Sequence, residues 1–122
     1  MKTHLLYPSD QPMPLQAFML EFVTALSSRY DFKGRFDVDQ QAQRPTLCYD
    51  SPAEALEKLS FFSTISLFTI EASDFALCFD LYEDVIEMEF RATGPDHLHL
   101  QETFKLVAAG ILAHFQAQDM IV

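Results

Sequence analysis

The feature that most constrains the fold is a change in the spacing of apolar residues in the middle of the chain. From position 64 to position 92, apolar and polar residues alternate, which is the pattern of strands with one buried face. This alternation predicts three successive strands joined by two tight turns. The strands are expected at 64–72, 75–82 and 85–92, and the turns at Ser73-Asp74 and Glu83-Asp84. The apolar face of such a meander has to be covered by other elements.

Three other segments have the 3.6-residue spacing of amphipathic helices. The first is predicted over 14–28, and its apolar stripe is Leu15, Phe18, Met19, Phe22, Val23 and Leu26. The second begins at Ser51-Pro52-Ala53-Glu54, where the serine can cap the helix and the glutamate can bond back. The third follows Gly94-Pro95-Asp96 and runs to Phe115, and its apolar stripe is wide enough to be contacted on more than one side.

The remaining segments complete an α+β fold. Residues 31–39 alternate as a half-buried strand, and Thr46–Tyr49 fits a short further strand. Gly34 marks a bulge or a close approach of another segment. The predicted order is α-β-(β)-α-β-β-β-α, an antiparallel sheet of four to five strands packed by three helices. Because 122 residues are typical of one domain, residues 1–122 are predicted to form a single α+β domain.

The chain carries 18 acidic and 8 basic residues, and its net charge is −10. Nucleic-acid phosphates and anionic lipid headgroups repel such a protein, so neither a nucleic acid nor a membrane is expected as a partner. A basic protein is the partner that the charge favours. The alternative is that the acidity serves only solubility. The chain shows no signal-peptide pattern and no span long enough for a bilayer, so a cytoplasmic localisation is expected.

The acidic residues concentrate on one predicted surface. Residues 71–102 contain nine acids and a single base, Arg91. If the turns are tight, Asp80 lies opposite Glu87 on the face turned away from the core, and such opposed like charges destabilise a sheet by up to about 1 kcal/mol. Carboxylates mixed with apolar residues have the composition of a protein-binding surface, and the alternative is a face that is only solvated. The predicted partner-binding residues are Asp80, Tyr82, Glu83, Asp84, Glu87 and Glu89.

The sequence carries no catalytic or metal-binding pattern. His97 and His99 would diverge on a helix, and neither a Cys-x-x-Cys nor a His-Glu-x-x-His spacing occurs. Cys78 is predicted to lie beside carboxylates, which raise the pKa of a thiol and weaken it as a nucleophile. Three glycines are too few for a glycine-rich phosphate loop. The chain is therefore expected not to be an enzyme, and no metal and no cofactor are expected.

In size, acidity and lack of catalytic residues, the chain resembles the small acidic immunity proteins that neutralise secreted bacterial toxins, especially basic nucleases. The resemblance implies an inhibitor whose carboxylates pair with the lysines and arginines that hold the toxin's phosphate substrate. The chain also resembles dimeric acidic secretion chaperones, which place more of their strands before the middle helix. A third alternative is a small-ligand-binding or enzymatic domain with a pocket that no sequence pattern reveals. Either a monomer or a homodimer is compatible with the sequence.

Overall fold

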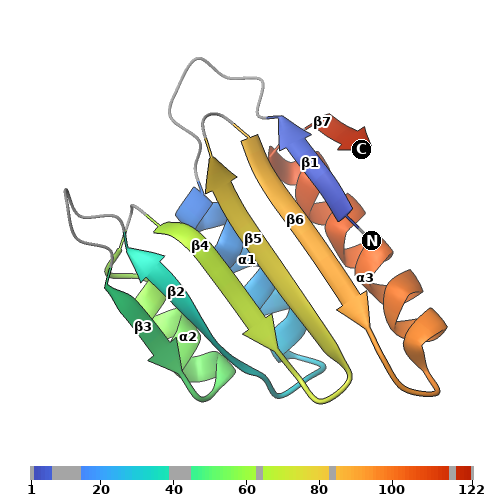
Figure 1. Ribbon diagram of the computed structural model, residues 1–122, viewed down its shortest axis with the longest axis horizontal. Helices are drawn as coiled ribbons and strands as arrows, with labels where there is room; N and C mark the ends of the chain where they lie inside the picture. The colour runs from blue at the N-terminus through green and yellow to red at the C-terminus, as the bar shows by residue number, and fades with distance from the viewer. Residues whose placement is uncertain are drawn as a thin grey trace.

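The computed structural model describes residues 2–6, 15–38, 45–62, 65–82, 85–115 and 118–121. Within these residues the chain forms seven strands and three helices (Figure 1). The strands are β1 (Lys2–Leu6), β2 (Lys33–Val38), β3 (Thr46–Tyr49), β4 (Ile65–Glu71), β5 (Phe75–Tyr82), β6 (Val85–Ala92) and β7 (Gln118–Ile121). The helices are α1 (Leu15–Ser27), α2 (Pro52–Leu59) and α3 (His97–Phe115).

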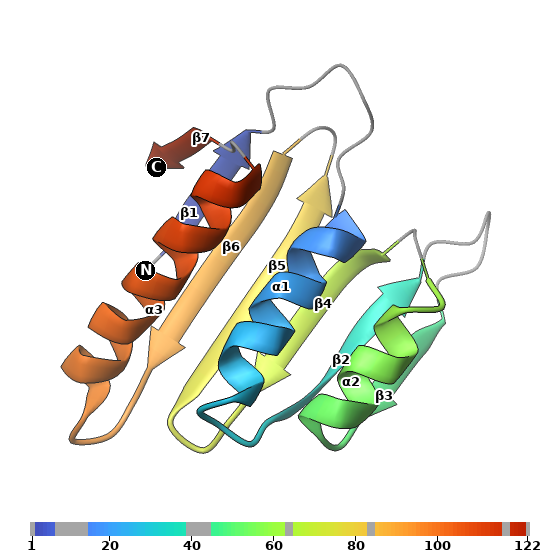
Figure 2. The same ribbon diagram turned by 180° about the vertical axis from the view of Figure 1, so that it is seen from behind.

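The strands form one antiparallel sheet in the order β3-β2-β4-β5-β6-β1-β7. The helices pack on one face of this sheet, as the two opposite views in Figures 1 and 2 show. In both views α1 lies between α2 and α3, and α3 lies behind β6 in Figure 1 and in front of it in Figure 2. The predicted α+β class is confirmed, and so is the order α-β-β-α-β-β-β-α between residues 15 and 115.

The two strands at the ends of the chain are not predicted by the sequence. β1 pairs with β6, and β7 pairs with β1, so the sheet continues beyond the expected strands. The β1 segment, Lys-Thr-His-Leu-Leu, shows no alternation of apolar and polar residues. Instead, β1 forms because its backbone pairs with the edge of β6, whose N–H and C=O groups would otherwise have no strand beside them. This pairing brings N-terminal residues beside the acidic strand β6.

The meander has the predicted register. Phe75 pairs with Ala92, and Asp80 pairs with Glu87. At the turn between β4 and β5, the Ala72 amide donates to the Phe75 carbonyl oxygen at 2.9 Å. The strand pairing is therefore the one that the predicted turns imply. Some predicted residues lie outside the described ranges, namely Pro14, Asp39, Thr64, Glu83 and Asp84.

The start of α2 follows from its local sequence. Ser51 is the N-cap, and its hydroxyl oxygen accepts a hydrogen bond from the Glu54 amide at 3.2 Å. The Glu54 carboxylate reaches back and accepts from the Asp50 amide at 3.3 Å. One turn later, Lys58 forms an ion pair with Glu54 at 2.8 Å. The two hydrogen bonds from the Glu54 and Asp50 amides satisfy backbone donors at the start of the helix.

The core between the helices and the sheet is largely aromatic. Phe22 of α1 lies 5.0 Å from the rings of both Phe18 and Phe79 and 6.0 Å from Phe104. Phe104 of α3 stacks on Phe90 of β6, with ring centroids 4.2 Å apart. All five residues are buried. Aromatic burial of this extent supplies much of the hydrophobic free energy of folding.

Gly34 of β2 marks a close approach, one of the two interpretations that the sequence left open. A β-carbon at this position would overlap the Thr69 carbonyl oxygen and the Tyr49 hydroxyl. Tyr49 is buried, stacks on Phe68 with ring centroids 5.6 Å apart, and donates a hydrogen bond from its hydroxyl to the Thr69 carbonyl oxygen. The glycine therefore gives the tyrosine room to connect β3 with β4.

Candidate functional site

The candidate site is the sheet face turned away from the helices, which we call the open face. In Figure 1 this face points toward the viewer, and no described element lies over it on β2, β4, β5 and β6. Because side chains alternate along a strand, the residues between the buried ones point to the open face. On these four strands its described side chains are Lys33, Arg35, Asp37, Leu67, Thr69, Glu71, Ala76, Cys78, Asp80, Glu87, Glu89 and Arg91.

The strand register arranges these twelve residues in three rows that cross the sheet from β2 to β6. The first row is Lys33, Glu71, Ala76 and Arg91, the second is Arg35, Thr69, Cys78 and Glu89, and the third is Asp37, Leu67, Asp80 and Glu87. Formal charges sum to +1 in the first row, to zero in the second and to −3 in the third. The open face is therefore polarised along its strands, and we call the third row the carboxylate row.

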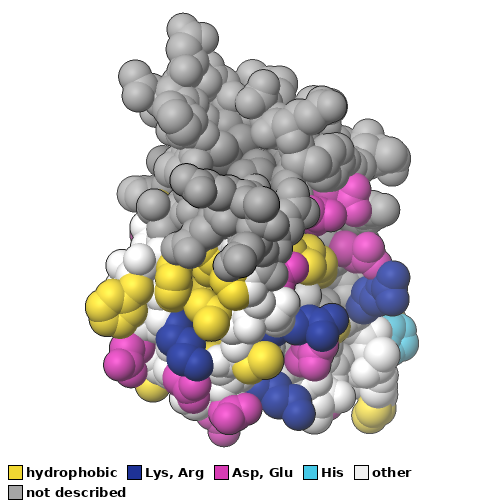
Figure 3. Space-filling view, turned by 60° about the vertical axis from the view of Figure 1, so that its left-hand side comes forward, with side chains coloured by type: hydrophobic (Ala, Val, Ile, Leu, Met, Phe, Trp, Pro, Cys, Tyr) yellow, Lys and Arg dark blue, Asp and Glu magenta, His cyan; other side chains and the backbone are white. Residues whose placement is uncertain are grey.

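This arrangement corrects the expectation that Arg91 is the only base of the acidic surface. β2 pairs with β4 and brings Lys33 and Arg35 to the same face. Figure 3, in which the β3 side comes forward, shows Lys and Arg side chains lying among Asp and Glu side chains. Among the twelve residues, the net negative charge therefore lies in the third row, at one end of the face. The sequence could not show this, because β2 and β4 are separated by a helix and a further strand.

Two predicted residues meet in the carboxylate row. Asp80 of β5 lies opposite Glu87 of β6. Asp80 is exposed and forms no ion pair with any described residue, whereas Glu87 is half-buried. At the other end of the row, Asp37 accepts a hydrogen bond from the Thr46 hydroxyl at 2.7 Å. The half-buried Leu67 lies between Asp37 and Asp80, so the row combines carboxylates with an apolar contact surface.

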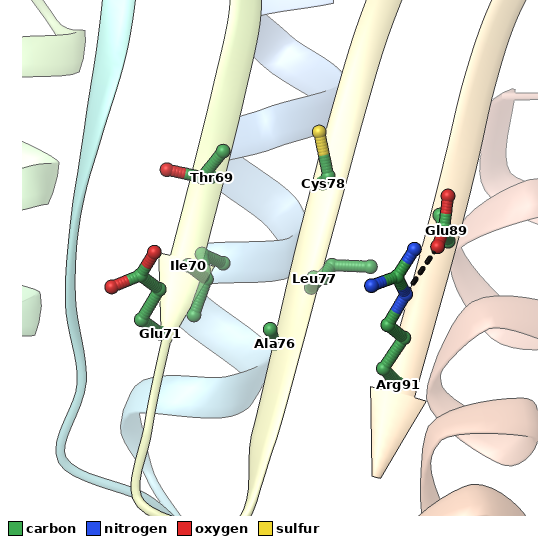
Figure 4. A pocket seen from close by; sticks show the side chains of 8 residues that line it. All are labelled: Thr69, Ile70, Glu71, Ala76, Leu77, Cys78, Glu89 and Arg91. Atoms are coloured by element: carbon green, nitrogen blue, oxygen red, sulfur yellow. Dashed lines mark hydrogen bonds and ion pairs between the residues drawn. The ribbon is translucent and has the colours of Figure 1, made fainter.

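The other predicted residues are placed differently. Glu89 lies in the second row, where its carboxylate forms an ion pair with Arg91 (Figure 4). The backbone of Tyr82 pairs with Val85, and its side chain is outside the described part of the structure, as are Glu83 and Asp84. Among the predicted residues with described side chains, Asp80 and Glu87 are thus the pair that the fold brings together.

The N-terminal strand adds two positions that sequence reasoning missed. The register places Lys2 opposite Glu89 and His4 opposite Glu87. Lys2 is therefore level with the second row, whose net charge is zero, and His4 is level with the carboxylate row. No local pattern identifies these neighbours, because strand pairing between residues more than eighty positions apart is decided by the tertiary fold.

A hollow of about 290 Å³ lies on the open face between β4 and β6. Ala76 is its smallest lining side chain, and Glu71 and Arg91 stand on opposite sides of it (Figure 4). Small-molecule sites usually have volumes of about 300 to 1,000 Å³ and enclose most of their ligand. This hollow lies just below that range. Nor do the described residues include a group of three or more side chains placed to hold a metal ion.

Cys78 lies in the second row and reports on the electrostatics of the face. Burial raises the pKa of its thiol, and the carboxylates of Asp80, Glu89 and Glu87 raise it further. Arg35 acts in the opposite direction and lowers this pKa. A thiol with a raised pKa is mostly protonated at neutral pH and is a poor nucleophile.

No known protein family, no curated protein and no solved structure matches this chain. Of the helices within the described ranges, none combines the length and the apolar character that a bilayer crossing requires.

Proposed function

We propose that the protein is a non-catalytic binding protein that captures a basic protein through the carboxylate row. In this proposal it acts as an immunity-type inhibitor and occludes a basic toxin, such as a nuclease. The observation that carries the proposal is the direct opposition of Asp80 and Glu87 on a sheet face that no described element covers. Opposed like charges on neighbouring strands repel each other, and a basic partner that binds both carboxylates would relieve this repulsion.

The geometry of the row indicates what the partner presents. Side chains opposite one another on neighbouring strands have β-carbons about 5 Å apart. Residues three or four positions apart on a helix have nearly the same spacing, about 5–6 Å. A helix with a lysine or arginine at such positions could therefore pair with Asp80 and Glu87 together, while Leu67 contacts its apolar stem. This arrangement favours a basic helical surface as the partner.

Electrostatic occlusion is the mechanism that follows. A basic nuclease uses lysines and arginines to hold the phosphates of its substrate. Carboxylates that pair with those side chains compete directly with the substrate for the same groups. The net charge of −10 also steers a cationic partner toward the protein, and such steering speeds association by about 10- to 1,000-fold at low ionic strength. Both effects weaken as salt shortens the Debye length.

The test is charge reversal on the open face. The double variant Asp80→Lys/Glu87→Lys is used as bait for capture from the source cell, beside the wild type and the control Glu21→Lys/Glu57→Lys. The control reverses the same charge at exposed positions on α1 and α2. The expected partner binds the wild type and the control, fails to bind the open-face variant, and is released from the wild type by salt.

Activity of the captured partner distinguishes the inhibitor from a mere binder. A purified nuclease should lose its activity in a one-to-one complex with the wild type and keep it with Asp80→Lys/Glu87→Lys. If the open-face variant binds the partner with the affinity and salt dependence of the wild type, the carboxylate row is not the binding site. That result would overturn the proposal even if binding itself is strong.

A dimeric secretion chaperone or adaptor is the second candidate, because α3 exposes two leucines on its outer face. Leu98 is 67% exposed and Leu106 is 77% exposed. A chaperone would bind its partner without abolishing the activity of the folded partner. The activity measurement on the complex therefore separates the two candidates.

A further inference from the structure

The outer face of α3 carries exposed apolar side chains, and no described element covers it (Figure 2). Leu98 and Leu106 are its large side chains, and both are mostly exposed. Leu106, Ala109, Gly110 and Ala113 follow the i, i+3, i+4, i+7 spacing of one helix face, and all four are exposed. The residues of α3 that face the core form a separate stripe on the opposite side, which is Leu100, Phe104, Ala108 and Ile111. The helix thus has two apolar faces, and the monomer buries one of them.

Gly110 is the residue that the monomer does not explain. Glycine inside a helix costs about 0.5–1 kcal/mol of stability relative to alanine. A β-carbon at Gly110 would have no described atom within 4 Å, so packing within the chain does not require a glycine there. Glycine does allow a second helix to approach closely, and that use requires a neighbour outside the chain.

The charges on this face are self-complementary. Glu102 and Lys105 are exposed on the outer side of α3, and their charged groups lie 3.6 Å apart. The face is therefore neutral, although the chain as a whole carries −10. In an antiparallel pair of α3 helices around a two-fold axis between these residues, Glu102 of each copy faces Lys105 of the other. A second copy is then attracted here, whereas the carboxylate row would repel it.

The same two-fold axis matches large side chains with small ones. It passes midway between Glu102 and Lys105, so it brings Leu98 of one copy opposite Ala109 of the other. The small side chain of Ala109 leaves space for the leucine, and the symmetry makes this contact twice, as in an isologous interface. Both the charge pairing and the packing thus point to one register.

We infer that the protein self-associates as a two-fold symmetric dimer through antiparallel α3 helices, with Leu98 and Leu106 as its apolar anchors. The dimer places the two helix layers inside and both open faces outside. This inference does not depend on the proposed function, because the carboxylate row lies on the other side of the sheet.

The test is the mass of the purified chain by sedimentation equilibrium over micromolar to millimolar concentrations. The wild type should reach twice the chain mass of 14.0 kDa. Leu106→Glu should raise the dissociation constant at least about thirtyfold, the change expected for loss of an interface hot spot. Phe61→Glu is the matched control, because Phe61 is 74% exposed but follows α2, and it should leave the dimer unchanged.

Charge exchange tests the register. Glu102→Lys should weaken the dimer, because it sets a positive charge against Lys105 of the second copy, and Glu102→Lys/Lys105→Glu should restore it. A wild type that stays at 14.0 kDa at every concentration would overturn the inference. So would a dimer that survives Leu106→Glu, since it would use another surface.

Discussion

The two faces of the sheet are made from alternate residues of the same strands, yet one is apolar and buried and the other carries charges of both signs. Along β5, Phe75, Leu77 and Phe79 are buried, and each contacts the helix layer or its aromatic core. Cys78 and Asp80 alternate with these residues and point to the open face, where their neighbours come from β4 and β6. The core face is apolar across β4, β5 and β6, whereas the net charge of the open face changes from positive to negative within three rows.

This difference shows how stability and recognition are divided within one sheet. The core face contributes stability through non-directional apolar burial, so any buried large residue matters in proportion to its area. The open face contributes little to stability, and its properties depend on which charges lie side by side. Substitutions on the two faces should therefore have effects of different size and kind.

The largest effect is expected from neighbouring residues on β5. Phe79→Ala should lower the free energy of unfolding by about 3–5 kcal/mol, because it leaves a cavity among buried aromatic rings. Asp80→Ala, one position away on the other face, should change it by no more than about 0.5 kcal/mol. Urea unfolding followed by circular dichroism measures both. Equal losses for the two variants would contradict the division between the faces.

The next effect concerns Tyr49, a core residue of β3 whose hydroxyl forms a hydrogen bond with β4. Tyr49→Phe should lower the free energy of unfolding by about 1 kcal/mol at neutral pH, since it removes the hydrogen bond to the Thr69 carbonyl oxygen. Burial raises the pKa of Tyr49, and the nearby Glu71 adds to the rise. The stabilisation that this shift represents is complete below the unfolded-state pKa of about 10 and is lost as the pH rises above it.

Unfolding measured at increasing alkaline pH checks the sign of this dependence. Above a pH of about 10 the unfolded chain ionises at Tyr49 while the folded chain keeps the proton, so the wild type should lose up to about 1.4 kcal/mol per pH unit from this residue. Tyr49→Phe should lack that component. An identical alkaline slope in both proteins would show that the hydroxyl is accessible to water.

A smaller effect of opposite sign is expected in the carboxylate row. Asp80→Asn removes the repulsion with Glu87 and should raise the free energy of unfolding by a few tenths of a kcal/mol. The gain should shrink in about 1 M salt, where the Debye length is about 3 Å. Asp31→Asn is the control at an exposed position outside the row. A loss of stability in Asp80→Asn would mean that Asp80 makes a favourable contact.

The smallest effect is on the reactivity of Cys78. In a Cys48→Ser background, Asp80→Asn should speed alkylation of Cys78 at a fixed, mildly alkaline pH, because it removes a charge that raises the thiol pKa. The Arg35→Gln change should slow the reaction, since Arg35 lowers the same pKa. Rates that respond to neither substitution would contradict the cross-strand neighbours that the register assigns to Cys78.

The sequence predicted most of the fold and part of the site. The alternation over 64–92 predicted β4, β5 and β6 with the correct pairing, so the opposition of Asp80 and Glu87 followed from two short turns. The capping residues around Ser51 predicted the start of α2. The approach of Lys33 and Arg35 to the acidic strands was not predicted, and neither was the pairing of β1 with β6.

What the sequence determined by itself is local: apolar periodicity sets which residues are buried, and capping and turn residues set where elements begin and end. The tertiary structure decided which strands are neighbours, and with it the charge gradient of the open face and the uncovered face of α3. The physical reason is that burial depends on the spacing of residues within one element, whereas electrostatic neighbours depend on contacts between elements distant in the chain. Those contacts form only when the strands pair into one sheet and the helices pack on it.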